Sequence, residues 1–518
     1  MEQNDIAIKR SIKTITIVMG LVLIAKISGF IRDVLVLRYM GDSPEGTAFA
    51  LASQIPRNFL DVAFAAAISA GFIPVFNFYL ERKTKDETFA LANNFITFVM
   101  VLSLAATAIG FLAAGPIANL HLMNEGGPEA TALMRDLLRI KIFTVFTAAT
   151  AFSLVGVLQS LGRFYIPSIM SLVPNILVLA YLALFFERFG VIGLAAAFII
   201  GNVLQLTILL PPLRKQGFVY RPLLVLNDPG LLKILRLTPM VLVSAWLFPI
   251  NNAVNNLIMS NHRPEAVVEL TAANTIYLVV TGFFVLSVTN VLFPKLSREA
   301  AKDKSQFAGI LSGAISGVVF LLFPMAAGLW LLRQPLFLLT YYGGEFSAQS
   351  AQNAAHAMGF LVVGMLGFGL TTILSRAFFS IMDGKTPMFA SLAAIILNAG
   401  ATLLLVAYLD IAAPALASAL SVTLAGVVML VVMAKKYPII SFKIVVNLGK
   451  MLLSAAIMTA VLLACMQAMH NLPDLLTVGI ICLLGVLLYF GVGLLLNINE
   501  AKMAKNMLLA RLRPRKDA

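Results

Sequence analysis

Charged side chains are scarce in this chain. They make up 12% of its 518 residues, whereas hydrophobic residues make up 60%. Soluble proteins average about 25% charged residues. The shortage of charge therefore excludes a water-soluble protein, a coiled coil and a disordered tail as descriptions of the whole chain. The composition indicates a chain that lies mostly in lipid.

Cysteines and enzyme motifs are scarce or missing as well. The two cysteines, Cys465 and Cys482, lie inside apolar runs and are typical of small buried residues, not of a disulfide framework. The chain contains no HExxH, CxxC or GxSxG pattern, and the segment "MDGKT" has Phe379 where a phosphate-binding loop needs its first glycine. We therefore expect no catalytic centre, no enzyme activity and no cofactor, and we expect "MDGKT" to form a turn.

Long apolar stretches recur along the chain and are separated by short polar connections. A helix that crosses a membrane needs about 20 residues, so the chain has room for about fourteen. The sequence predicts an all-α polytopic membrane protein, and its polar start runs into an apolar helix too long for a cleavable signal peptide. The expected spans are 14–40, 48–80, 88–118, 131–161, 166–187, 191–213, 231–261, 266–294, 306–340, 350–381, 386–409, 412–434, 447–470 and 475–497.

Lysine and arginine are divided unevenly between the connections. Of the 38 basic residues, 27 fall in one alternate set of connections and termini, and four fall in the other. Because cytoplasmic loops collect Lys and Arg, both termini are predicted to be cytoplasmic. The same bias explains the net charge of +14, so nucleic acid is not an expected partner. Seven basic residues lie at membrane depth or near a span end: Lys26, Arg32, Arg57, Arg135, Arg139, Lys141 and Arg376.

The sequence repeats weakly at an offset of 220 residues. "SLGRFYIPSIMSL" coincides with "SIMDGKTPMFASL", and the prolines of "GFIPVF" and "VLFPKL" also coincide. This predicts two pseudo-symmetric six-helix lobes related by an axis along the membrane normal, as in transporters that rock two halves about a central site. The predicted domains are 1–222 and 223–440 for the two lobes, and 441–518 for two further helices and a basic cytoplasmic tail.

Several spans carry polar residues, which are costly inside a membrane and usually face protein or a water-filled cavity. Those in the first, second, seventh and eighth spans include Lys26, Ser28, Arg32, Asp33, Gln54, Arg57, Asn58, Asp61, Asn255 and Asn274. A net-positive cavity that holds an anion is one interpretation, because Arg and Lys pair with phosphate groups.

Structural interpretations stay open beside the functional one. Arg57 and Asp61 have the spacing of a self-neutralising pair on one helix, and the asparagines could join helices by hydrogen bonds. Arg135, Arg139 and Lys141, together with Asp136, are interpreted as an interfacial rim with side chains that reach water.

The first eighty residues resemble a known family. The segments "AKISGFIRDVLVLRYMG" and "AFALASQIPRNFLDVAFAAAISAGFIPVF" are similar to the amino-terminal signature of the MurJ/MviN lipid II flippases, in the multidrug/oligosaccharidyl-lipid/polysaccharide exporter superfamily. Fourteen spans, two lobes and cytoplasmic termini agree with that family. The matching residues are Gly29, Phe30, Arg32, Asp33, Ala48, Phe49, Pro56, Phe72 and Pro74.

The resemblance implies translocation of lipid II, an undecaprenyl-pyrophosphate-linked peptidoglycan precursor, across a bacterial cytoplasmic membrane by alternating access. The family binds the pyrophosphate through cationic residues in a central cavity. Lys26 stands at the first such position and Arg32 matches the second directly. Leu60 occupies the next, for which Arg57 is the expected substitute, and Thr275 occupies the last. The implied substrate-binding set is Lys26, Ser28, Arg32, Asp33, Arg57, Asn58, Asp61 and Asn274.

Coupling to an ion is a further implication of the resemblance. Some members bind sodium in the second lobe through carboxylates, but the nearest positions here, Asn255, Asn398 and Thr402, are uncharged, and Asn274 stands where the family often has Asp. They are weak metal candidates, and the expected driving force is an ion gradient or the membrane potential, with the ion unknown. Membrane lipids and cell-wall synthesis proteins are the other expected partners.

Three alternative functions stay open. They are an exporter of another polyprenyl-linked glycan, a drug or cation antiporter of the same superfamily, and a non-transporting membrane scaffold for cell-wall synthesis. A cation exporter would need acidic residues in its cavity, whereas the predicted cavity is basic.

Overall fold

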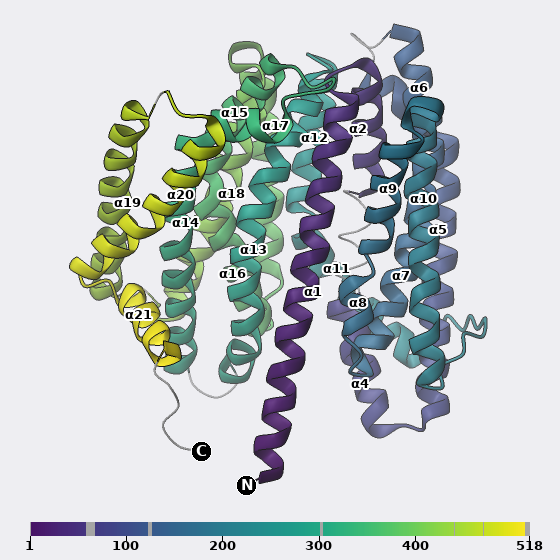
Figure 1. The fold of residues 1–518 in the computed structure, drawn as a ribbon. Helices are drawn as coiled ribbons and strands as arrows, with labels where there is room; N and C mark the ends of the chain where they lie inside the picture. The colour runs from purple at the N-terminus through teal and green to yellow at the C-terminus, as the bar shows by residue number, and fades with distance from the viewer. Residues whose placement is uncertain are drawn as a thin grey trace. The chain divides into compact units, whose positions relative to one another are not determined.

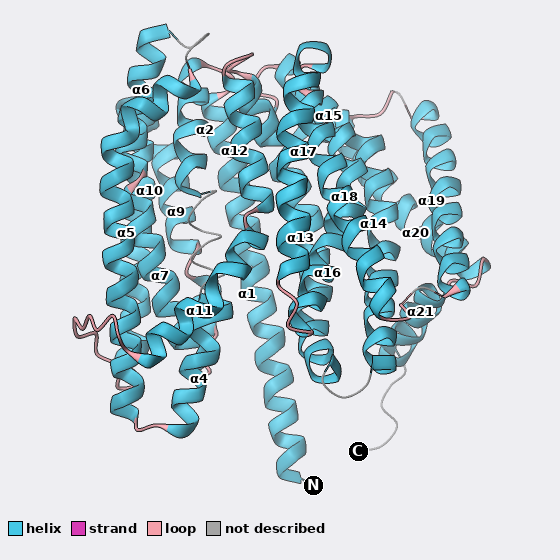
Figure 2. Ribbon diagram, turned by 180° about the vertical axis from the view of Figure 1, so that it is seen from behind, coloured by secondary structure: helices cyan, strands magenta, loops and turns pink. Residues whose placement is uncertain are grey.

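The structure is a computed structural model that describes residues 2–57, 68–122, 127–300, 304–439, 441–469 and 471–512. These residues form helices joined by short turns, and no β-strand occurs among them (Figure 2). Ten segments of the described chain are long and apolar enough to cross a membrane. The prediction of an all-α polytopic membrane protein is therefore confirmed, and these ten segments are consistent with fourteen spans.

The chain forms two compact units, and their helices are labelled in Figure 1. Unit 1 comprises Met1–Val268 together with Gly343–Phe346, and unit 2 comprises Glu269–Tyr342 and Ser347–Ala518. These units are defined by internal contacts, whereas the predicted domain boundaries rest on the repeat and stay predictions. The helices of unit 1 are α1 (Glu2–Met40), α2 (Pro44–Pro56), the π-helical turn η2 (Ile68–Phe72), α4 (Ile73–Arg82), α5 (Lys85–His121), α6 (Gly127–Lys141), α7 (Phe143–Ser160), α8 (Tyr165–Ile169), α9 (Leu172–Leu184), α10 (Phe186–Lys215), α11 (Pro229–Ala245) and α12 (Leu247–Ser260).

Unit 2 begins inside a long helix and contains the rest of the chain. Its first helix, α13, starts three residues before the boundary, so Ala266–Val268 belong to unit 1. The helices are α13 (Ala266–Ala300), α14 (Lys304–Tyr341), α15 (Ala348–Leu361), the 3₁₀ turn η3 (Val362–Gly364), α16 (Met365–Ser380), α17 (Lys385–Leu409), α18 (Ala412–Lys436), α19 (Phe442–Ala468), α20 (Asp474–Leu495) and α21 (Asn499–Leu512).

Local sequence fixes where several helices begin. Ser43 caps α2 by accepting a hydrogen bond from the Gly46 amide, and Pro44 supplies a first helical residue whose missing N–H is not needed. Thr84 and Glu87 form a reciprocal capping box at the start of α5. Each cap satisfies amides that the first helical turn leaves without partners.

The helix ends follow the 220-residue offset predicted from the sequence. In each pair, an end in the first part of the chain recurs 220 residues later, although most of the side chains differ. The pairs are Met40 of α1 with Ser260 of α12, His121 of α5 with Tyr341 of α14, and Ser160 of α7 with Ser380 of α16.

Unusual backbone conformations follow the same offset. Gly162 and Met382 both have positive φ, at 72° and 59°, and so do Gly190 and Asp410, at 56° and 45°. Three backbone hydrogen bonds close the turn after Ser160, and the same three recur 220 residues later. Left-handed backbone is unfavourable for residues other than glycine, so its recurrence at Met382 and Asp410 strongly supports the internal repeat.

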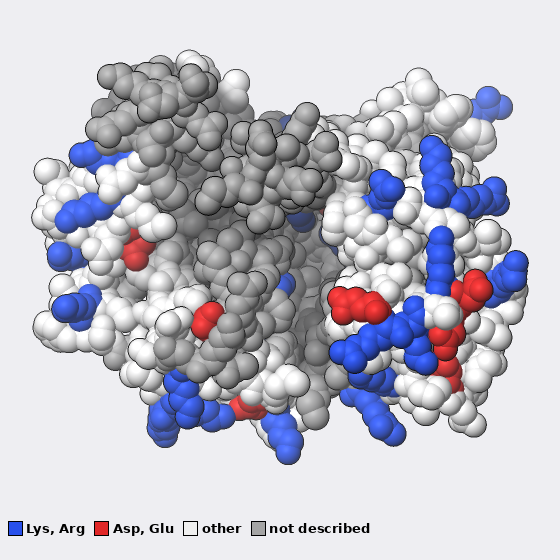
Figure 3. Space-filling model, turned by 90° about the horizontal axis from the view of Figure 1, so that it is seen from below, with Lys and Arg blue, Asp and Glu red and all other residues white. Residues whose placement is uncertain are grey.

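Basic side chains gather on the face seen in Figure 3. Exposed basic residues of the connections include Lys83, Lys215 and Arg221 in unit 1, and Lys385 and Lys435 in unit 2. They belong to the set that the charge count assigns to the cytoplasm. The orientation of this face in a membrane stays a prediction.

Candidate functional site

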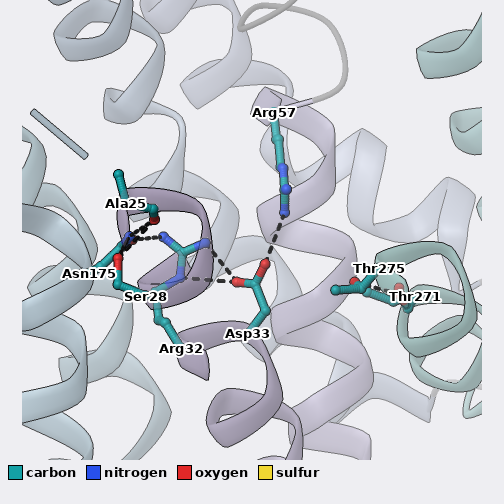
Figure 4. A network of polar contacts seen from close by, with 8 residues as sticks. All are labelled: Ala25, Ser28, Arg32, Asp33, Arg57, Asn175, Thr271 and Thr275. Atoms are coloured by element: carbon teal, nitrogen blue, oxygen red, sulfur yellow. Dashed lines mark hydrogen bonds and ion pairs between the residues drawn. The ribbon is translucent and has the colours of Figure 1, made fainter. Parts of the chain in front are cut away.

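Arg32 of α1 is the centre of a polar network in unit 1 (Figure 4). Its Nε and Nη2 donate hydrogen bonds to Asp33 Oδ1 at 3.0 and 2.7 Å, and its Nη1 donates to Asn175 Oδ1 of α9 at 2.7 Å. The side chains of Arg32 and Asp33 are 17% and 22% exposed. The guanidinium is therefore held from two sides in one orientation.

Asn175 is fixed to α1 by its other end. Its Nδ2 donates hydrogen bonds to Ser28 Oγ at 2.8 Å and to the Ala25 carbonyl at 3.3 Å. Gly29 lies beside this contact, and a Cβ there would meet the same nitrogen at 3.4 Å, an ordinary van der Waals distance. The predicted site residue Ser28 thus positions Asn175, and Asn175 positions Arg32.

Arg57, which follows α2, extends the network toward solvent. Its Nη1 lies 4.0 Å from Asp33 Oδ2, and its side chain is 62% exposed. Asn58 and Asp61 lie outside the described residues, so the pairing of Arg57 with Asp61 is not tested. Within the described chain, the carboxylate that meets Arg57 is Asp33.

Lys26 is placed differently from the other predicted cations. Its side chain is exposed on α1, and among the described residues it forms no hydrogen bond with Arg32, Asp33 or Arg57. The structure therefore brings Arg32, Asp33, Arg57 and Ser28 together and leaves Lys26 outside this network.

Lys141 corrects one sequence interpretation. It was expected at an interfacial rim, but its side chain is only 4% exposed. Its Nζ lies 3.5 Å from the centroid of the Phe198 ring and 4.5 Å from that of Phe49. The reason is that α6 packs against α2 and α10, which close over its last residue. The spacing of residues along α6 does not predict that two other helices pack over Lys141.

The rest of the expected rim is as predicted. Arg135 and Arg139 are about 40% exposed and lie 2.8 and 3.9 Å from Asp136.

We call Arg32, Arg57 and Lys141, together with the carboxylate of Asp33, the cationic cluster. Asn175 and Lys141 are the members of this site that sequence reasoning missed. For Asn175 the available signal was a lone amide inside the apolar run "SLVPNILVL".

Three of the four asparagines of α12 are buried. Asn251, Asn255 and Asn256 are 2–3% exposed, and Asn256 donates a hydrogen bond to Gln54 of α2. Beside this bond lies a cavity of about 300 Å³ lined mostly by apolar side chains of α2, α5 and α12. The bond supports the structural interpretation for Asn256, which joins two helices.

The remaining predicted positions lie in unit 2. Asn274 is 8% exposed, and the hydroxyl of Thr275 donates to the Thr271 carbonyl at 2.8 Å (Figure 4). Asn398 and Thr402 lie one turn apart on α17, are fully buried, and Asn398 accepts a hydrogen bond from Ser418. Where the chain is described, no group of three or more His, Cys, Asp or Glu side chains could hold a metal ion. Asn255, Asn398 and Thr402 stay weak candidates for an ion site, and the coupling ion stays unknown.

The segment "MDGKT" forms the predicted turn. Asp383 precedes the N-cap residue of α17 and accepts hydrogen bonds from the Thr386 amide at 3.1 Å and from Lys436 Nζ at 2.7 Å. Burial alone would raise the pKa of the Asp383 carboxyl, but the hydrogen bonds from Lys436 and Thr386 outweigh this effect and lower the pKa below its ordinary value.

Taken together, the fold and the site define a multi-pass membrane protein with a partly enclosed cationic cluster in its amino-terminal half. A family model described as "Lipid II flippase MurJ" matches residues 36–483. The chain belongs to the MurJ family, so the family that the sequence resembles is confirmed.

Relatives and solved structures agree with this assignment. A Vibrio cholerae protein named "Probable lipid II flippase MurJ" is 29% identical over 403 residues, which cover 75% of this chain and 76% of the relative. A Burkholderia cenocepacia protein named "Lipid II flippase MurJ" is 24% identical over 394 residues, covering 74% of this chain and 75% of the relative.

Among solved structures, "Lipid II flippase MurJ, inward closed conformation" superposes with a TM-score of 0.77 at 21% identity, and the match covers 92% of this chain and 97% of that one. An inward-facing multidrug resistance MATE family transporter of the MOP superfamily superposes with a TM-score of 0.65 at 15% identity, covering 81% and 97%. Both likenesses concern the fold.

Proposed function

We propose that this protein flips lipid II from the inner to the outer leaflet of the bacterial cytoplasmic membrane. The family membership supports the reaction, and the cationic cluster supports the way in which the substrate is held. An arginine carries five N–H donors, and the bonds to Asp33 and Asn175 use three of those of Arg32. Two donors on an oriented guanidinium are available to an anion, and this is the observation on which the proposal rests.

The pyrophosphate of the substrate would meet Arg57 first, because this side chain is the most exposed member of the cluster. Its loose 4.0 Å contact with Asp33 can be exchanged for a phosphate oxygen, while Arg32 keeps its orientation. Charge-assisted hydrogen bonds contribute about 1.5–3 kcal/mol each. A few of them would hold the headgroup while the prenyl chain stays in lipid.

Release on the outer side requires the binding site to become accessible from that side and to hold the pyrophosphate less tightly. We propose alternating access, in which rocking of the two six-helix lobes opens the site to the outer side, where water replaces the contacts between the cluster and the pyrophosphate. An ion gradient or the membrane potential would drive the cycle. Asn255, Asn398 and Thr402 stay weak candidates for an ion site.

A drug or cation exporter is less well supported by the same geometry. Asp33 is the carboxylate of the cluster, and Arg32 already occupies one of its oxygens through two hydrogen bonds. A cationic substrate would therefore meet a site of net positive charge. An exporter of another polyprenyl-linked glycan would share the pyrophosphate contacts and is distinguished by the choice of substrate.

Complementation tests the proposal. In bacterial cells depleted of their own lipid II flippase, the wild-type gene should restore growth and Arg32→Ala should not, although the variant inserts at normal levels. Arg32→Lys should restore part of the function, because the charge survives while the bidentate geometry is lost. Arg188→Ala, which removes an exposed arginine elsewhere in unit 1, is the matched control.

Two results would contradict the proposal. If Arg32→Ala restores growth as well as the wild type does, Arg32 does not hold the substrate and the proposed binding by the cationic cluster is wrong. If the wild-type protein fails to complement but moves another polyprenyl-linked glycan in reconstituted vesicles, the choice of lipid II is wrong.

A further inference from the structure

Lys141 is the most enclosed charge of the cationic cluster. It is the last residue of α6 and lies near the middle of the membrane-crossing segment Gly127–Ser160. Its side chain is 4% exposed, compared with 17% for Arg32 and 62% for Arg57. Lysine is rarely buried to this degree unless a partner compensates its charge.

Two aromatic rings surround the ammonium group. The rings of Phe49 on α2 and Phe198 on α10 lie 6.0 Å apart and are inclined at 47°, and the Nζ of Lys141 is within cation–π distance of both. These rings attract a cation, but they carry no negative charge and accept no strong hydrogen bond. The three N–H donors of the ammonium group therefore keep their capacity for an oxygen ligand.

Phe198 connects Lys141 to Arg32. The guanidinium carbon of Arg32 lies 5.2 Å from the centroid of the ring that Lys141 approaches to 3.5 Å. The two distances together limit the separation of the two cations to about 9 Å. Arg32, Asp33 and Arg57 are also the charged groups that act electrostatically on Lys141. The three cations and the carboxylate thus form one local group with a formal charge of +2.

No carboxylate of the described chain forms an ion pair with Lys141. A methionine or leucine would fill the space between the two rings without the cost of burying a charge, so packing alone does not explain a lysine here. A buried ammonium group next to an oriented guanidinium is instead suited to an anion that arrives from outside the protein.

We propose that Lys141 is a further substrate-binding residue, which contacts the diphosphate of the transported lipid together with Arg32. Phe49 and Phe198 hold the ammonium group in place while the site is empty, and the flexible side chain leaves the rings when the anion enters. This inference rests on the proposed function, because it assigns Lys141 to the same diphosphate. Arg57, Arg32 and Lys141 then form a sequence of cations from the exposed to the buried side of the site.

The test measures binding and stability in the same variants. The full-length protein in nanodiscs is titrated with farnesyl pyrophosphate, with farnesol and inorganic pyrophosphate as comparisons. Lys141→Met should weaken farnesyl pyrophosphate binding about tenfold to a hundredfold, the loss expected for one charge-assisted contact. It should leave the unfolding temperature unchanged or raise it, because an unpaired buried charge is removed. Lys141→Arg should recover part of the affinity.

Arg139→Met is the matched control, because it removes a cation from the same helix without changing the cluster. It should bind like the wild type. If Lys141→Met keeps wild-type affinity and instead lowers the unfolding temperature, the lysine has a packing role and the inference is wrong. If the wild type binds farnesyl pyrophosphate no better than farnesol, the proposed function itself fails, whatever Lys141 does. Equal affinity for inorganic and prenyl diphosphate would keep the anion site but contradict its assignment to a lipid.

Discussion

Asn175 offers the sharpest test of how the cationic cluster is oriented. The amide is 2% exposed and joins α9 to α1 through the Ala25 carbonyl, Ser28 Oγ and Arg32 Nη1. Asn175→Ala removes all three bonds. Ala25 and Ser28 keep a bond to each other, so the main loss falls on Arg32.

The size of the effect follows from the bond that Arg32 loses. A hydrogen bond to a charged group contributes about 1.5–3 kcal/mol, which corresponds to about tenfold to a hundredfold in affinity if the whole loss is felt at the diphosphate. Arg32 would keep Asp33 as a partner and turn toward it, away from α9. The variant should therefore bind farnesyl pyrophosphate weakly and complement poorly, although every cation is still present.

Titration of the variant in nanodiscs, with thermal unfolding measured in parallel, checks this expectation. Asn202→Ala is the control, since it removes another amide of unit 1 that is not part of the network. Wild-type affinity in correctly folded Asn175→Ala would show that the orientation of Arg32 does not matter for binding. A loss of affinity that occurs only together with a collapse of the unfolding temperature would show that Asn175 acts through stability alone.

Two further predictions concern the connections. Asp383 has a lowered pKa in the folded state, so its stabilising effect is full above the unfolded-state pKa and is lost as pH falls through the folded-state value. Asp383→Asn should therefore cost about 1 kcal/mol or less at pH 7, because Lys436 is largely exposed, and the difference from the wild type should vanish in acid; an equal difference at pH 7 and pH 3 would refute this. In a background without the two native cysteines, a cysteine at Glu45 should react with an impermeant reagent added outside intact cells, and cysteines at Lys83 and Lys435 should not; reversed labelling would refute the predicted orientation.

The fold was largely predictable because its main signals are local or repeated. Apolar runs indicate membrane helices, and the glycine and charges of "GFIRD" mark the network around Arg32. Helix breaks inside apolar runs were not predictable in the same way. Span 131–161 is divided into α6 and α7 at Ile142, and span 231–261 into α11 and α12 at Trp246, because hydropathy measures composition over a window and does not register a change of direction.

The details of the site depend on tertiary packing that the sequence does not state. Arg32 and Asp33 are neighbours in the chain, so their pairing could be expected. Asn175 reaches Arg32 across 143 positions, and Lys141 is enclosed only because α2 and α10 pack over the end of α6. Contacts between residues so far apart in the chain cannot be predicted from the periodicity and composition of a single sequence.

The backbone conformations that recur at the 220-residue offset also indicate how the chain evolved. A glycine adopts left-handed backbone at low cost, whereas methionine and aspartate do so with strain, yet Met382 and Asp410 keep the conformations of Gly162 and Gly190. A half-length ancestral gene that duplicated and fused accounts for this pattern. The two copies then diverged at these positions while the turns were retained, so the main-chain geometry preserves a common origin that the side chains have almost erased.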